Sequence, residues 1–76
     1  MLDKEISANM LSAIIKDLSA QEASAIATIQ LLLNNSAGIA SHSDVLGEIK
    51  KWAKVGADAK GAKDFLIERF TTTVED

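Results

Sequence analysis

The fold of this 76-residue chain depends most on residues 20–34, which read AQEASAIATIQLLLN. In a helix drawn through this segment, alanine, isoleucine and leucine occupy nearly every side. A surface helix usually carries one apolar stripe and one polar face, whereas a helix that is apolar all round is buried on all sides. In so short a chain, the segment predicts either the centre of a helical bundle or an interface with another chain.

A separate helix is predicted upstream, over residues 3–18, because apolar residues recur there at steps of three and four, the period of an α-helix. The sequence Ser19-Ala20-Gln21-Glu22 then has the pattern of a capping box, in which side chains at the first and fourth positions satisfy free backbone N–H groups. We therefore expect a tight turn at Ser19 and a second helix over residues 20–34.

The third predicted helix carries an apolar stripe that includes Trp52. Gly38 is a suitable left-handed cap for the end of the second helix. Ser41, Ser43 or Asp44 can cap the start of the third, because short polar side chains accept hydrogen bonds from the first turn. We expect this third helix to end at Gly56, which also begins the last glycine-containing region of the chain.

A fourth helix is predicted over residues 59–70, with Asp58 as its N-cap. A continuous helix over residues 44–70 is the alternative, and residues 71–76 are expected to form a frayed tail. The chain is therefore predicted to be one all-α domain over residues 1–76, a compact bundle of four short helices, or of three if the last two are continuous. Short connections favour antiparallel neighbours.

Catalysis and metal binding have little support in the composition. The chain has no cysteine or tyrosine and a single histidine, His42. Without cysteine there are no disulfides, zinc–thiolate sites or iron–sulfur clusters. A metal site needs three or four ligands, and only Asp44 and Glu48 are near His42 in sequence. We interpret His42 as a polar residue beside a helix cap, and expect no catalytic, cofactor-binding or metal-binding residues and no enzymatic activity.

The carboxylates Asp64 and Glu68 lie four residues apart, on one side of the predicted fourth helix. Such a pair can do acid–base work in a cleft. Lys60 and Arg69 lie close enough in sequence to balance their charge. We therefore interpret the pair as part of a solvated helix face.

Nucleic-acid binding is the main rival function. Ala57, Gly61 and Ile67 have the spacing of a helix–turn–helix motif, with a turn at Gly56 or Gly61. The residues available for nucleic-acid contact are Lys50, Lys51, Lys54, Lys60 and Lys63. The formal net charge of −3 offers little attraction to phosphate, however, so nucleic acid is not the expected partner.

A membrane partner is also not expected. The most apolar stretch, residues 23–33, is far shorter than the roughly 20 residues that cross a bilayer, and polar residues interrupt it. The chain starts with mixed charge rather than with the positive charge of a secretory leader. With no leader pattern and no cysteine, the expected location is cytoplasmic.

The most favoured function is a noncatalytic protein–protein interaction module that self-associates, a small regulatory or structural factor of bacterial or phage type. A two-fold dimer is expected, with another protein as a further possible partner. The predicted interface residues belong to the apolar second helix: Ile26, Ile29, Leu32 and Leu33. The competing hypothesis is that Trp52, Phe65 and Phe70 cover this helix within a monomer.

Overall fold

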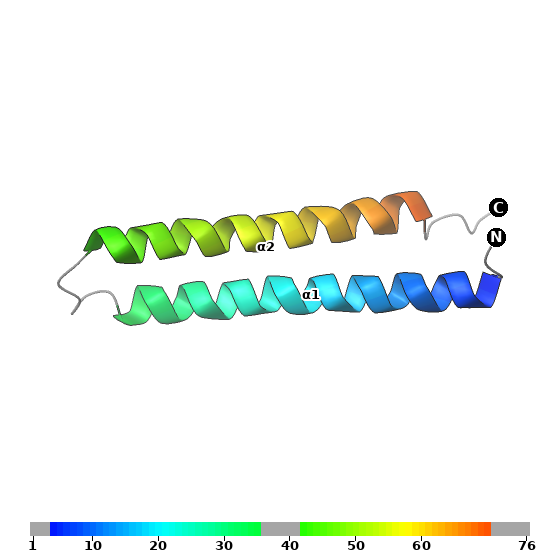
Figure 1. Cartoon of the computed structure of the whole chain (residues 1–76), viewed down its shortest axis with the longest axis horizontal. Helices are drawn as coiled ribbons and strands as arrows, with labels where there is room; N and C mark the ends of the chain where they lie inside the picture. Colours follow the sequence, from blue (N-terminus) through cyan, green and yellow to red (C-terminus); the bar gives the residue numbers. More distant parts are fainter. Residues whose placement is uncertain (1–3, 36–41, 71–76) are drawn as a thin grey trace.

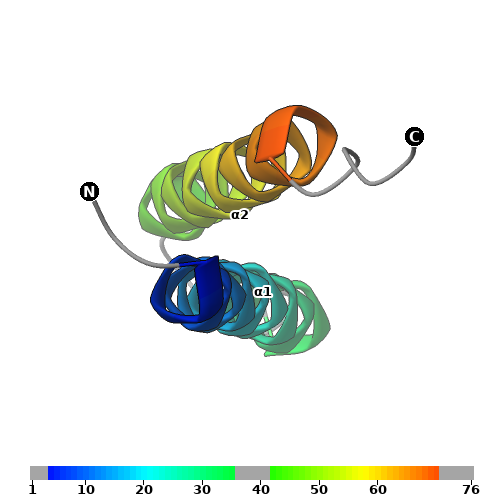
Figure 2. The ribbon, with the colours of Figure 1, turned by 90° about the vertical axis from the view of Figure 1, so that its right-hand side faces the viewer.

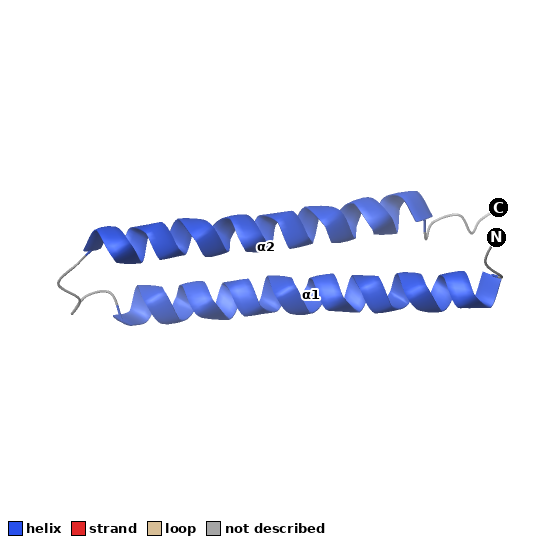
Figure 3. Ribbon diagram, in the orientation of Figure 1, coloured by secondary structure: helices blue, strands red, loops and turns tan. Residues whose placement is uncertain are grey.

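The computed structural model describes residues 4–35 and 42–70, with side chains described from Ile6 in the first stretch and from Asp44 in the second. Both stretches are helical throughout: α1 is Lys4–Asn35 and α2 is His42–Phe70. The two helices lie side by side and antiparallel, so the start of α1 and the end of α2 are at the same end of a helical hairpin (Figure 1; Figure 3). The hairpin is a rod of 56 × 18 × 18 Å.

The prediction of a compact bundle of four short helices is therefore wrong, and so is its three-helix version, because the expected turn at Ser19 does not form. Helix α1 continues through Ser19, which is half-buried in the helix interior. A capping box is a local pattern, and no glycine or proline stands beside Ser19 to stop the preceding helix. The Glu22 side chain, which would have completed the box, instead reaches Lys63 on the other helix.

The alternative of one continuous helix over residues 44–70 is confirmed, with the start two residues earlier, at His42. Neither Gly56 nor Gly61 ends the helix. A glycine in a helix interior costs only about 1 kcal/mol relative to alanine, which packing along a helix of this length can offset. Asp44 lies in the first turn and Arg69 in the last, where their charges complement the helix dipole.

The two helices pack through a seam that repeats every seven residues. In both helices the seam residues are all buried or half-buried and are spaced alternately by four and three. In α1 they are Leu11, Ile15, Leu18, Glu22, Ala25, Ile29 and Leu32. In α2 they are Val45, Ile49, Trp52, Gly56, Ala59, Lys63 and Leu66. This spacing is the heptad pattern of a coiled coil.

Small residues occupy the centre of the seam. Ala25 and Ala59 are almost fully buried, and a Cβ atom added at Gly56 would lie only 3.1 Å from the Cβ of Ala25. The backbones of α1 and α2 therefore approach each other closely at Gly56. The glycine that the sequence suggested as a helix end is in fact a contact point between two helices.

The seam leaves most of the apolar surface uncovered. Among the described residues only Ala25, Val45 and Ala59 are buried, and none of them is large. An end-on view shows two helices with no third described element over either side of the pair (Figure 2). The predicted caps Gly38, Ser41 and Ser43, and the predicted tail over residues 71–76, fall outside the described residues or side chains.

Candidate interaction surface

One ion pair interrupts the apolar seam. The Lys63 Nζ atom donates a hydrogen bond to the Glu22 Oε1 atom at 3.0 Å, and each side chain keeps less than a quarter of its surface exposed. Each charge thus has an opposite charge in contact at a position where the heptad pattern calls for an apolar residue. Sequence reasoning missed this pair, although both residues lie on heptad positions that could have indicated it.

A second ion pair involves Lys60, another lysine of the set predicted to contact nucleic acid. The Lys60 Nζ atom donates to the Asp64 Oδ2 atom at 2.9 Å, one helical turn away on exposed surface. This hydrogen bond raises the pKa of Lys60 above its ordinary 10.5 and lowers the pKa of the Asp64 carboxyl below 3.8. Asp64 is therefore engaged by Lys60, as the interpretation of a solvated, charge-balanced face expected.

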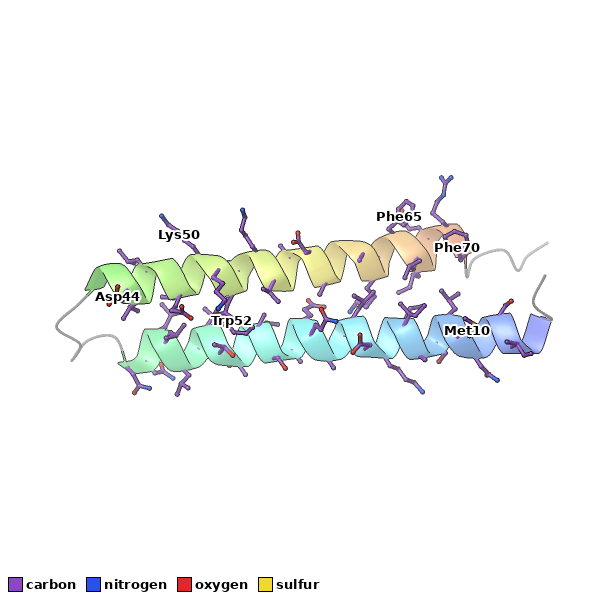
Figure 4. All side chains as sticks on the ribbon, viewed as in Figure 1. Met10, Asp44, Lys50, Trp52, Phe65 and Phe70 are labelled. Atoms are coloured by element: carbon purple, nitrogen blue, oxygen red, sulfur yellow. The ribbon has the colours of Figure 1, made fainter. Side chains whose placement is uncertain are left out.

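The other three lysines lie on the exposed surface of the first half of α2. They are Lys50, Lys51 and Lys54. Lys50 points away from α1 (Figure 4). Because α2 is continuous through Gly56 and Gly61, the described residues contain no helix–turn–helix. The structure does not bring the five lysines onto one exposed surface, because Lys63 lies half-buried in the seam and Lys60 is paired with Asp64.

The aromatic residues do not wrap α1. Trp52 points toward α1 and is half-buried in the seam, where its Nε1 atom donates to the Glu48 Oε1 atom at 3.3 Å and Lys51 lies 5.3 Å from its ring (Figure 4). Phe65 and Phe70, in contrast, are more than half exposed. Two of the three aromatic residues that could have covered α1 within a monomer therefore face solvent.

The predicted interface residues divide into two groups. Ile29 and Leu32 are half-buried seam residues facing α2. Ile26 and Leu33 keep 50% and 58% of their surface exposed. Only the second pair is therefore available to a partner without opening the hairpin.

A second heptad series runs through Ile26 and Leu33, beside the seam. It consists of Ser19, Ala23, Ile26, Gln30 and Leu33, and we call it the apolar flank of α1. Leu46 and Ala53 of α2 are exposed and begin a seven-residue series that reaches Lys60. These residues directly follow seam positions of α2, as Ile26 and Leu33 directly follow seam positions of α1. Equivalent heptad positions of two antiparallel helices lie on the same side of the pair. Leu46 and Ala53 therefore lie on the same side of the hairpin as the apolar flank.

The opposite flank of α1 is mainly polar. It consists of Asp17, Gln21, Ser24, Thr28 and Leu31, and we call it the polar flank. Its side chains bond within their own helix: the Gln21 Nε2 atom donates to the Asp17 Oδ2 atom at 3.1 Å, and the Thr28 hydroxyl donates to the Ser24 carbonyl at 2.8 Å. Two sides of the same helix thus differ sharply in chemistry.

No family model, no curated protein and no solved structure matches this chain. Neither described helix is long and apolar enough to cross a membrane. Within residues 4–35 and 42–70 there is also no group of three or more His, Asp or Glu side chains placed to hold a metal ion. The side chain of His42, the residue at which α2 starts, is not among those described.

Proposed function

We propose that this chain is a noncatalytic protein–protein interaction module that self-associates, with a two-fold dimer as its assembled form. The observation that carries the proposal is the amount of large apolar surface left outside the seam. Ten large apolar residues among those described keep 38% to 61% of their surface exposed. They lie on both helices and include aromatic side chains. Burying these side chains against a second copy is favourable, because it removes apolar surface from water.

The total accessible surface supports the same proposal. The chain exposes 5671 Å², whereas a compact monomer of 8.1 kDa is expected to expose about 4500 Å². The excess, roughly 1200 Å², exceeds the ~800 Å² that each partner buries in a stable protein–protein interface. Pairing of two hairpins would form a four-helix bundle, which buries such faces in a common core.

A two-fold dimer is the simplest closed assembly, because the same surface patch of each copy forms both sides of the contact. The proposal places the dimer in the cytoplasm, because a chain without cysteine gains no stabilising disulfide from an oxidising compartment. Its assignment to a bacterial or phage regulatory or structural factor rests on size and composition alone.

Molar mass in solution tests the proposal directly. One chain has a mass of 8.1 kDa. Light scattering and sedimentation at about 100 μM should give twice this mass. A monomer at that concentration with full helix content would contradict self-association. In that case the exposed apolar residues would be surface features of a single hairpin or the binding site of a different protein.

The nucleic-acid alternative has its own test. We expect only weak, salt-sensitive association of duplex DNA with Lys50, Lys51 and Lys54, because Lys63 is paired in the seam, a carboxylate lies beside Lys60 and the net charge is −3. Fluorescence anisotropy with a labelled duplex at roughly physiological salt measures this. Nanomolar affinity would favour the alternative function.

A further inference from the structure

We propose that the second copy docks on the apolar flank of α1, with the two α1 helices antiparallel and Ile26 of one copy facing Ile26 of the other at the two-fold axis. This inference rests on the proposed self-association and adds which of the available surfaces forms the contact. The occupant is a second copy of this chain. Charge, the cost of burying polar groups and two-fold symmetry each favour it.

Charge favours a second copy over an oppositely charged partner. Residues 23–35 of α1 contain no charged side chain. The nearest charge, Glu22, is already engaged by Lys63. Lys60, the charge that α2 adds to this side, is paired with Asp64. Two copies therefore approach through α1 without repulsion and without burying an unpaired charge, which would be costly. A partner recognised by charge would instead be expected to bind the charged face of α2.

The polar groups distinguish the two flanks of α1. Docking on the polar flank would bury the Asp17 carboxylate together with Ser24 and Thr28. The apolar flank presents two polar side chains, Ser19 and Gln30, and Ser19 is already half-buried. The cost of removing polar groups from water is therefore lower on the apolar flank.

The residue order of the apolar flank suits a two-fold antiparallel contact. With Ile26 at the axis, Ala23 of one copy faces Gln30 of the other, and Ser19 faces Leu33. A small side chain thus meets a longer one on each side of the axis, the arrangement that lets facing positions interdigitate. Leu46 and Ala53 of α2, on the same side of the hairpin, extend the contact beyond α1.

The first test compares Ile26→Asp with Leu31→Asp. The two residues lie on opposite flanks of α1 and are 50% and 61% exposed, so each change should leave the seam intact. Ile26→Asp should weaken the dimer about 100-fold or more, because it places two facing carboxylates at the axis. Leu31→Asp should leave the dimer unchanged. Sedimentation measures assembly, and circular dichroism checks that the helices remain.

A second test uses the absence of cysteine from the chain. In the Ile26→Cys variant the two thiols would meet across the axis, so mild oxidation should give a disulfide-linked dimer in high yield. In the matched Leu31→Cys variant the thiols would lie on outer surfaces and crosslink slowly, if at all. This pair of variants decides the question even if Ile26→Asp fails to fold.

The outcomes separate this inference from the proposed function. A monomeric wild-type chain would overturn both. A wild-type dimer that Leu31→Asp dissociates and Ile26→Asp does not, or one that crosslinks through Leu31→Cys and not through Ile26→Cys, would overturn the apolar flank and leave self-association standing. A dimer lost in Ile26→Asp and crosslinked through Ile26→Cys supports both.

Discussion

The two helices of the hairpin have similar lengths and very different surfaces. Helix α2 carries eleven charged residues among 29, and α1 carries five among 32. Both helices contribute seven residues to the same seam. Outside the seam, α2 presents lysines and carboxylates together with four exposed apolar residues, Leu46, Phe65, Ile67 and Phe70. The second half of α1 presents only neutral side chains. The helices therefore differ in charge: α2 mixes charged and apolar residues outside the seam, whereas the second half of α1 has a seam and a second, uncharged apolar flank.

This difference indicates distinct roles for the helices. An amphipathic helix whose other faces are charged can cover one neighbour and remain soluble on its outer side. A helix with two apolar sides gains from a neighbour on each. In the proposed dimer α1 contacts both α2 and the second copy, whereas the charged side of α2 faces solvent. The following predictions test the seam first and then the outer surface of α2.

The largest effect is expected at the close approach of the two helices. Gly56→Leu should lower the free energy of unfolding by about 2–3 kcal/mol, because the added side chain must force α2 away from Ala25. Gly61→Leu is the matched control, since a Cβ at Gly61 meets nothing within 4 Å, and it should be neutral or stabilising. Urea unfolding measures both. Equal effects at the two sites would show that the backbones do not meet at Gly56.

The next effect concerns the charged pair in the seam. Removing one partner, in Glu22→Leu or Lys63→Leu, should destabilise the protein by about 1–2 kcal/mol, because a partly buried charge loses its counter-charge. The double variant should recover most or all of this loss, since two leucines complete the heptad pattern. Additive losses in the double variant would mean that Glu22 and Lys63 do not interact.

A smaller effect is expected from glycines on the outer surface of α2. Gly47→Ala and Gly61→Ala should each stabilise the protein by up to about 1 kcal/mol, because alanine favours the helix and the added methyl group meets no other atom. Gly56→Ala should gain less, because its methyl group would lie 3.1 Å from Ala25. Thermal unfolding of the three variants ranks them, and a larger gain at Gly56 would contradict the close approach.

The smallest effect belongs to the exposed pair of Lys60 and Asp64. Asp64→Asn should leave the unfolding midpoint unchanged at neutral pH, because solvent screens exposed ion pairs. The pKa of Asp64 is lowered, so whatever stability the pair adds is present above pH 3.8 and lost as pH falls below that value. The pKa of Lys60 is raised, so the same contribution is lost only above pH 10.5. A midpoint that changes between these limits in wild type but not in Asp64→Asn would contradict this.

Local sequence patterns were enough to predict the helices but not their ends. The steps of three and four and the absence of proline indicated an all-helical chain, and the alternative of a continuous helix over residues 44–70 was confirmed. The helix ends predicted at Ser19 and Gly56 were wrong. A capping box or a glycine ends a helix only where packing against a neighbour does not stabilise the continued helix. Here the Glu22 side chain binds Lys63 on the other helix, and the absence of a side chain at Gly56 leaves room for Ala25.

The candidate interface could be predicted only in part, because it also depends on how the two helices pack against each other. Composition identified residues 20–34 as apolar on too many sides, and Ile26, Ile29, Leu32 and Leu33 followed from that. Which of them α2 covers depends on how the two helices are aligned, and this is a property of both helices together. The rotation that brings Ala25 close to Gly56 and buries Ala59 also turns Ile29 and Leu32 inward. It leaves Ile26 and Leu33 outside.

The sequence by itself thus determined that the chain is helical, that its second quarter is too apolar for a surface helix, and that its charges are concentrated elsewhere. These properties follow from residue types and short-range periodicity. Only the tertiary structure decided that there are two long helices, that Lys63 pairs with Glu22 across the seam, and which apolar side faces outward. Those outcomes depend on contacts between residues far apart in the chain, such as Glu22 with Lys63, which local patterns do not encode.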